Sequence, residues 1–157
     1  MFYKLTLTLA VLLANTCNHP PVKKESSPVV VQANTTGSVW HYIQQKRWKL
    51  IQMQGKMQEP SPSMWLEFDT TTHRFSGNGG CNKLAGAFTV AGDVITFQKV
   101  QSTLMACLDQ KANERETDIL RLLSDHTYTF DVADQTLQLY DSSKIILMFG
   151  AQGKDEK

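Results

Sequence analysis

Residues 77–97 read GNGGCNKLAGAFTVAGDVITF, and this stretch decides the fold class. It begins with a dense run of glycines, which supply the backbone freedom that a tight turn requires. Two short apolar runs follow, at 87–90 and 94–97, and the tripeptide Ala-Gly-Asp at 91–93 separates them. Short runs of β-branched and aromatic residues joined by a glycine-containing turn predict an antiparallel β-hairpin.

The same alternation of apolar runs and turn residues continues on both sides of this hairpin. In the run 48–53, Trp48 and Leu50 share one face by the two-residue period of a strand. Gly55 and the proline-containing loop 59–63 separate that run from the next. The pattern predicts further strands at 64–69, 74–76, 128–132, 136–140 and 144–149.

One segment has the periodicity of a helix instead. Between 109 and 125, Ala112, Glu116, Ile119, Leu120 and Leu123 recur at spacings of three and four residues. We expect an amphipathic helix over residues 109–124 that begins at an aspartate N-cap. Such a helix buries its apolar stripe only against the sheet. The prediction is therefore an α+β domain, mostly antiparallel β, with a small curled sheet and one packed helix.

Two segments of this chain resemble a known family. Residues 77–88, GNGGCNKLAGAF, resemble the Gly-Cys-Asn core of the META domain, and residues 102–107, STLMAC, resemble its second signature. Residues 48–55 resemble its opening strand, so the resemblance covers about residues 46–149. The similarity is to the HslJ-type META family, which includes heat-shock lipoproteins of the bacterial envelope linked to novobiocin resistance. It implies a cracked barrel with one packed helix, and it supplies no catalytic residue, substrate or cofactor.

The first residues predict export. Lys4 precedes an apolar run at 5–14, which suits the signal-peptide core of about 7–15 residues and is short for a membrane helix of roughly 20. Cys17 and the polar Asn18 follow, as in a bacterial lipoprotein signal, where the cysteine is acylated. We therefore expect a signal peptide at 1–16 and lipidation of Cys17. The alternative is cleavage after Ala14, which leaves Cys17 as a free thiol.

Composition then divides the remaining chain. Residues 17–38 are rich in proline and polar residues, which predicts a disordered tether, with an edge strand at 29–31 as the alternative. The domain is expected at 39–150 and a flexible tail at 151–157. Asn18, in place of aspartate after the cysteine, favours lipid anchoring in the outer membrane with the domain facing the periplasm. The 16 Lys and Arg balance 15 Asp and Glu, so no nucleic-acid partner is expected.

Cys81 and Cys107 are the first candidates for chemistry. In an oxidising compartment two such cysteines most simply form a disulfide. The rival readings are a redox pair, a metal site and a nucleophile. The chain has no Cys-x-x-Cys motif, and its histidines lie at no short spacing from either cysteine. Cys-His catalysis stays open, because catalytic partners meet in space rather than in sequence.

The glycines of the motif invite a phosphate-loop reading, but no Lys-Ser or Lys-Thr follows them. A structural turn explains them better, with asparagine side chains bonded to its backbone; the turn motif comprises Gly77, Asn78, Gly79, Gly80, Asn82 and Gly86. Large apolar residues nearby are expected in the core, or along a groove that holds a lipid or peptide, namely Trp65, Phe75, Phe88, Phe97 and Met105.

These observations predict a non-enzymatic envelope lipoprotein without a metal or cofactor. Its domain is expected to act as a binding or assembly module for an envelope protein, a peptide or a lipid, with a link to envelope stress or antibiotic tolerance implied by the resemblance. The alternative is a thiol-dependent redox protein or enzyme that uses Cys81 or Cys107.

Overall fold

The computed structural model describes residues 35–59 and 63–155. The predicted signal peptide, Cys17 and most of the predicted tether lie outside these residues. The described residues belong to one unit, Gln32–Lys157. Their elements, in chain order, are α1 (Thr35–Gln44), β1 (Lys46–Met53), β2 (Lys56–Met57), β3 (Trp65–Asp69), β4 (Arg74–Asn78), β5 (Lys83–Ala91), β6 (Val94–Ser102), α2 (Gln110–Leu123), β7 (Thr127–Ala133), β8 (Thr136–Asp141) and β9 (Lys144–Gly153).

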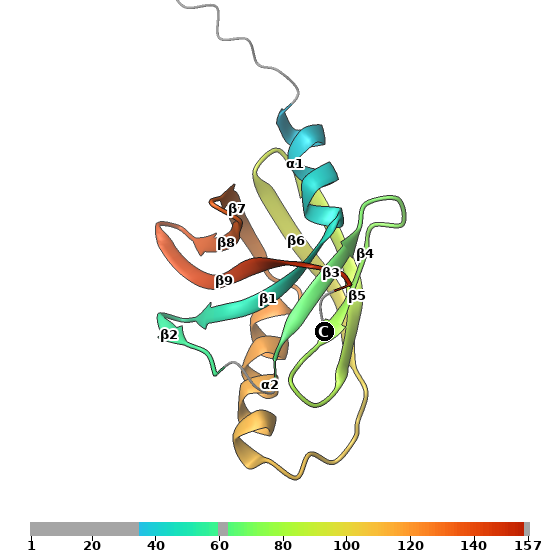
Figure 1. Ribbon diagram of the computed structural model, residues 1–157, viewed down its shortest axis with the longest axis vertical. Helices are drawn as coiled ribbons and strands as arrows, with labels where there is room; N and C mark the ends of the chain where they lie inside the picture. Colours follow the sequence, from blue (N-terminus) through green and yellow to red (C-terminus); the bar gives the residue numbers. More distant parts are fainter. Residues whose placement is uncertain (1–34, 60–62, 156–157) are drawn as a thin grey trace, which may run out of the picture. The chain divides into compact units, whose positions relative to one another are not determined.

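The nine described strands form one antiparallel sheet that closes on itself. From β3 to β9 each strand pairs with its neighbour in the chain, and β1 pairs with both β3 and β9, while β2 extends β1 as a short outer strand. Figure 1 shows the resulting ring of strands, with β1 and β9 side by side. The predicted α+β fold with a curled, mostly antiparallel sheet is confirmed.

The ring is not a regular barrel, because two of its seams are short. β1 pairs with β3 only over Arg47–Lys49, and β6 pairs with β7 only over Val94–Thr96. The rest of β6 continues past β7 and contacts α2. A cracked ring with a helix beside the gap agrees with the architecture that the family resemblance implies.

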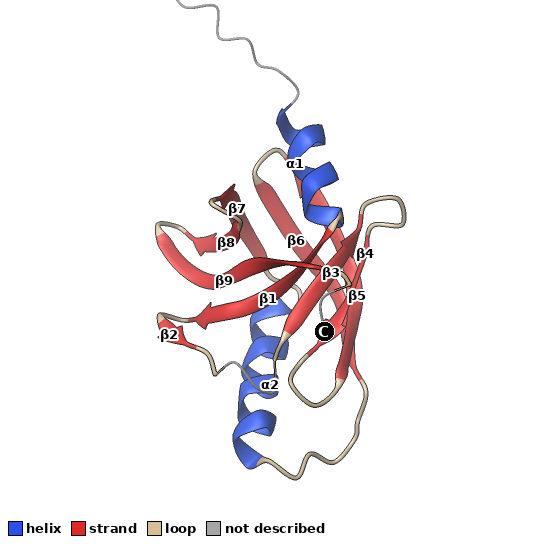
Figure 2. Ribbon diagram, viewed as in Figure 1, coloured by secondary structure: helices blue, strands red, loops and turns tan. Residues whose placement is uncertain are grey.

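Helix α2 lies where the periodicity places it. Its N-cap is Asp109, whose carboxylate accepts a hydrogen bond from Lys111 N at 2.9 Å, and its C-cap is Ser124. The helix lies beside the sheet (Figure 2) and contacts β6. Its buried residues are Ala112, Glu116, Ile119, Leu122 and Leu123. Just beyond the helix, the buried Tyr128 hydroxyl donates to Leu122 O at 2.6 Å. Burial of this phenol raises the pKa of Tyr128 to about 12, and Asp141 acts in the same direction.

Helix α1 has no counterpart among the elements that the sequence predicts. It begins at Thr35, inside the stretch 17–38 assigned to a tether, and it carries Trp40 and Ile43 into the core with exposures of 8% and 0%. Trp48 Nε1 donates to Ile43 O at 2.9 Å, which ties the end of α1 to the start of β1. The helix is short, so its apolar contacts with the sheet, rather than helix propensity, account for its stability.

The end of the domain also differs from the expected boundary at 150. Strand β9 continues to Gly153, because Ala151, Gln152 and Gly153 pair with Trp48, Arg47 and Lys46 on β1. The segment 151–153, assigned to a tail, therefore belongs to the sheet. Composition cannot show this, since Ala, Gln and Gly have no strong strand preference and the pairing with β1 places them in the sheet.

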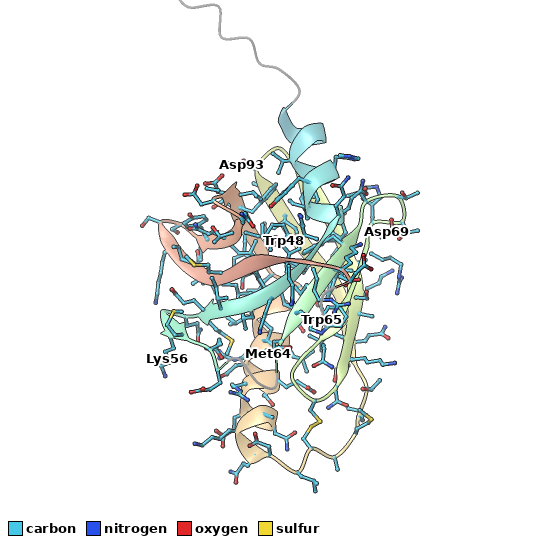
Figure 3. The ribbon with its side chains drawn as sticks, viewed as in Figure 1. Trp48, Lys56, Met64, Trp65, Asp69 and Asp93 are labelled. Atoms are coloured by element: carbon cyan, nitrogen blue, oxygen red, sulfur yellow. A yellow bond between two sulfur atoms is a disulfide. The ribbon has the colours of Figure 1, made fainter. Side chains whose placement is uncertain are left out.

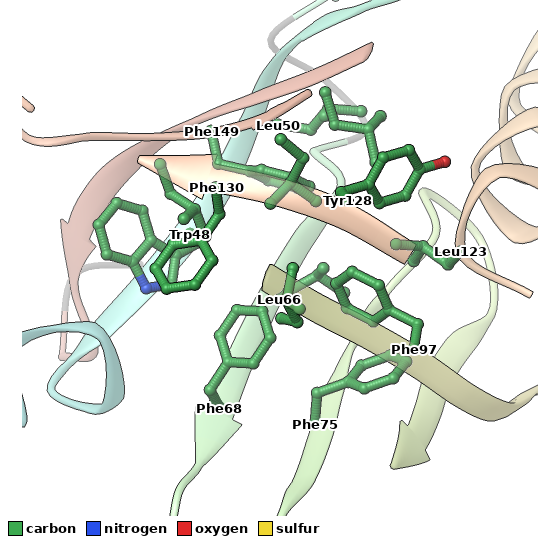
Figure 4. Close-up of a cluster of buried hydrophobic side chains, with 14 of the residues drawn as sticks. Trp48, Leu50, Leu66, Phe68, Phe75, Phe97, Leu123, Tyr128, Phe130 and Phe149 are labelled. Atoms are coloured by element: carbon green, nitrogen blue, oxygen red, sulfur yellow. The ribbon is translucent and has the colours of Figure 1, made fainter. Parts of the chain in front are cut away.

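The core fills the ring with aromatic side chains. Phe68, Phe75 and Phe97 come from β3, β4 and β6 and point towards one another, with the rings of Phe75 and Phe97 at 5.4 Å between centroids (Figure 4). Leu123 of α2 reaches the same cluster. Each large apolar side chain buried here contributes about 1.5–3 kcal/mol to folding. The interior is therefore a packed core.

Candidate functional site

The glycine-rich turn joins β4 to β5 at residues 79–82. Asn78 Oδ1 accepts a hydrogen bond from Gly80 N at 2.6 Å, and Gly79 N donates to Asn82 O at 2.8 Å. Gly80 has a φ of 107°, a conformation that residues with a side chain rarely adopt. The turn therefore folds back tightly, and its next two backbone N–H groups are free to bind a group from elsewhere in the domain.

That group is the carboxylate of Glu116 on α2, which is 5% exposed. Its Oε2 accepts hydrogen bonds from Asn82 N at 2.7 Å and from Cys81 N at 3.3 Å. Its Oε1 accepts from Asn82 Nδ2 at 2.7 Å and from Ser102 Oγ at 3.4 Å. Burial of a carboxylate is strongly unfavourable unless its oxygens are hydrogen-bonded. The turn and the helix therefore stabilise each other.

Asn82 extends this network to the segment that precedes α2, residues 103–109, which we call the β6–α2 loop. Its side-chain Oδ1 accepts hydrogen bonds from Thr103 Oγ1 and Met105 N, both at 2.8 Å. Because its Nδ2 donates to Glu116, Asn82 uses both ends of its amide. An aspartate would place a second carboxylate beside Glu116, and a leucine would satisfy neither partner.

A disulfide between Cys81 and Cys107 closes the same site, with the two Cα atoms 6.0 Å apart. The predicted bond is therefore present in the structure. It links the turn to the β6–α2 loop directly beside Asn82. The three residues of the Gly-Cys-Asn motif thus hold one corner of the domain: Gly80 forms the turn, Cys81 bonds the loop, and Asn82 bonds the loop and Glu116.

Replacing both cysteines with serine is expected to lower the free energy of unfolding by about 3–4 kcal/mol, because the bond closes a loop over a sequence separation of 26 residues. Urea unfolding of the purified domain measures this change. Reductant should destabilise the wild-type protein by a similar amount and leave the double variant unaffected. Equal stability of the oxidised and reduced wild-type protein would contradict the prediction.

The other motif glycines serve close packing rather than positive φ. A Cβ on Gly79 would lie 2.7 Å from Glu116 Cγ, so the carboxylate reaches the turn only because residue 79 lacks a side chain. A Cβ on Gly77 would collide with the backbone oxygen of Trp65, and one on Gly86 with the ring of Phe75. These three positions therefore require glycine because another group occupies the space beside each one.

The expected core residues lie in three different environments. Phe75, Phe88 and Phe97 are buried at 2% exposure or less. Trp65, labelled in Figure 3, is half-buried on β3, where the Arg47 guanidinium stacks 4.2 Å from its ring centroid. Met105 is 58% exposed, so its expected place in the core is wrong. The hydrogen bonds of its backbone with Asn82 hold residue 105 outside the ring.

Glu116 is the site residue that sequence reasoning missed. The periodicity places it in the apolar stripe of α2, between Ala112 and Ile119, and gives no role to its charge. A carboxylate on an apolar face is the available signal, because such a group requires a set of donors opposite it. The sequence does not show which donors these are.

Within the described ranges 35–59 and 63–155, no group of three or more His, Cys, Asp or Glu side chains is placed to hold a metal ion. No described helix combines the length and apolar character needed to span a bilayer. Hydrogen bonds join the turn to α2 and to the β6–α2 loop, and the disulfide closes this junction.

A family model decides the classification of the chain, since the META domain model matches residues 41–154. The chain belongs to the META domain family. The matched residues include β1 to β9 and α2, together with the disulfide and the Asn82–Glu116 junction. The junction described above is therefore a feature within the META domain of this chain. None of the curated proteins compared with the chain matches it.

Two solved structures show the same fold as this META domain. One, described as an NMR structure of a protein, has a TM-score of 0.56 at 21% identity, over 70% of this chain and 92% of that one. The other, the NMR structure of a protein from Burkholderia xenovorans, has a TM-score of 0.55 at 22% identity, over 83% of this chain and 98% of that one. At these identities the likeness concerns the fold alone.

Proposed function

We propose that this protein is a lipid-anchored protein of the bacterial envelope whose META domain is a binding or assembly module rather than an enzyme. In this proposal, residues 1–16 direct export, acylated Cys17 anchors the chain in the outer membrane, and the segment 17–34 links the anchor to the domain. The partner is an envelope protein, a peptide or a lipid. A role in envelope stress or antibiotic tolerance belongs to the same proposal and is based on resemblance to the HslJ-type branch of the family.

The Cys81–Cys107 disulfide is the observation that carries this proposal. Disulfides persist in oxidising compartments such as the periplasm and are rare in the cytosol, so the bond supports export. It also counts against a nucleophilic or metal-binding role of either cysteine. A nucleophilic or metal-binding cysteine acts as a thiolate, and neither sulfur is a thiolate while the bond is closed.

The polar groups of the junction support the same reading. Glu116 and Asn82 are the buried polar side chains among the described residues, and both are bound to each other and to backbone groups. A general acid or base needs access to a substrate proton. Here each carboxylate oxygen is already occupied by donors of the turn, so the arrangement is suited to holding the loop in place.

Substitution of Cys17 by serine is expected to release the protein from the membrane fraction and to remove the mass of the acyl groups. Intact-mass spectrometry and fractionation of the envelope measure both effects. Ser27→Ala, a change in the same segment that leaves the cysteine intact, is the matched control and should remain anchored. A wild-type chain that is soluble and carries no acyl mass would contradict the anchor.

Photo-crosslinking from exposed positions of the domain tests the binding role. The expected result is one recurrent envelope partner or a crosslinked lipid. If no partner or lipid is captured and purified protein carries one reactive free thiol, the proposal fails in favour of the thiol-dependent alternative.

A further inference from the structure

Asn78 and Gly79 form the only Asn-Gly sequence of the chain, at the start of the glycine-rich turn. An asparagine in this position is open to a reaction that needs no enzyme. The backbone nitrogen of the glycine attacks the side-chain carbonyl carbon of the asparagine, ammonia leaves, and a succinimide ring forms. Glycine permits this attack best, because it has no Cβ to hinder its own nitrogen. Water then opens the ring and gives aspartate or isoaspartate.

The turn polarises the carbonyl group but occupies the nucleophile. Gly80 N donates to Asn78 Oδ1 at 2.6 Å, and this oxygen is where negative charge develops during the attack. Gly79 N, which has to attack, instead donates to Asn82 O at 2.8 Å. The attack requires that this nitrogen lose its proton to solvent, and the hydrogen bond to Asn82 opposes that loss. The reaction therefore requires the bond between Gly79 and Asn82 to open.

Contacts from outside the turn keep this bond closed. A Cβ on Gly79 would lie 2.7 Å from Glu116 Cγ, so α2 fills the space beside the glycine. Glu116 also accepts hydrogen bonds from Cys81 N and Asn82 N. A disulfide joins Cys81 to Cys107. Opening of the turn is therefore coupled to the junction, and loss of the Glu116 carboxylate or of the disulfide makes it easier.

We propose that Asn78 is a modification site controlled by the junction. Its amide is preserved while Glu116 and the disulfide hold the turn, and it converts through the succinimide to aspartate and isoaspartate once the turn opens. The net reaction consumes a water molecule at the side-chain amide and releases ammonia, so it requires no enzyme, metal or oxidant. It involves neither the binding partner nor the lipid anchor of the proposed function.

Isoaspartate makes the opening permanent. It adds a methylene group to the main chain between residues 78 and 79, at the end of β4, where Asn78 pairs with Trp65 and Lys83. The longer main chain shifts the turn relative to β5, so its N–H groups no longer meet Glu116. The modification therefore records an opening of the junction and prevents the junction from closing again.

Mass spectrometry of the purified protein, incubated at mildly alkaline pH, tests the site. Trypsin cuts after Arg74 and Lys83 and releases residues 75–83, in which fragmentation locates the conversion. Oxidised wild-type protein should convert slowly at Asn78. Reductant, or the variant Glu116→Leu, should raise the rate by about tenfold or more, because the open population of the turn rises as the junction loses stability. Labelling with an isoaspartate methyltransferase should detect isoaspartate in both cases.

Matched variants separate the junction from general unfolding. Trp40→Ala destabilises the core at α1 rather than at the turn, and its conversion rate should stay close to that of the wild type. Asn78→Gln lengthens the side chain, which hinders ring closure, and should abolish conversion in residues 75–83 even with reductant. Circular dichroism establishes that each variant is folded during incubation. If Glu116→Leu is unfolded, Glu116→Gln and the reduced wild-type protein provide the same comparison.

Three outcomes would overturn the proposal. The first is conversion of oxidised wild-type protein as fast as that of the free peptide 75–83, because the fold would then give Asn78 no protection. The second is equal acceleration in Trp40→Ala and Glu116→Leu, which would assign the protection to global stability. The third is slow conversion in the reduced protein and in the Glu116 variants alike, because the opened turn would then not react.

Discussion

Replacing Glu116 with leucine is expected to lower the free energy of unfolding by about 3–5 kcal/mol. The leucine has a similar size, but it leaves Cys81 N, Asn82 N and Asn82 Nδ2 without the acceptor that they share in the native fold. Buried donors without partners are the reason for the large effect. Thermal or urea unfolding of the oxidised domain measures it, with an expected fall in melting temperature of about 10–20 °C.

Two further variants serve as controls for Glu116→Leu. Glu114→Leu changes an exposed residue of the same helix and should shift stability by no more than about 0.5 kcal/mol. Glu116→Gln keeps one acceptor oxygen but places an amide NH₂ group among donors, so its loss should be intermediate. A Glu116→Leu domain as stable as the Glu114→Leu domain would show that the carboxylate does not hold the junction.

Truncation of Trp40 to alanine is expected to cost about 3–5 kcal/mol, because its indole fills the end of the ring that α1 covers. The ring centroid of Trp40 lies 5.3 Å from that of Phe88 and 5.2 Å from that of Phe130. Its Nε1 has no hydrogen-bond partner among the described residues, so the loss is one of packing. Chemical unfolding and hydrogen exchange of α1 are the measurements.

Trp40→Phe keeps most of the aromatic contact and removes the N–H group that lacks a partner, so it should retain most of the stability. His41→Ala, an exposed change on the same helix, should have little effect. If Trp40→Ala matches His41→Ala, then α1 is not part of the cooperative unit and the domain begins at β1.

The sequence alone determined every strand except the short β2, the second helix and the family. Strand 48–53 and the hairpin at 87–97 follow from two-residue alternation and a glycine turn, and α2 follows from a three- and four-residue period with an aspartate cap. These signals are local, because the backbone periods of helices and strands impose them on any chain. The disulfide between Cys81 and Cys107 could also be predicted, because two such cysteines most simply bond to each other in an oxidising compartment.

The tertiary structure decided the rest. Contacts between distant residues pair β1 with β9, which closes the ring, and place α1 over one end. They also leave Met105 facing solvent and bury Glu116. The Gly-Cys-Asn motif shows the limit clearly. Its glycines and asparagines predict a turn, but the turn exists to bind a carboxylate that lies 34 residues further along the chain from Asn82. A period in the sequence reports which face of an element is apolar, whereas a hydrogen bond between two buried groups depends on where both elements are packed.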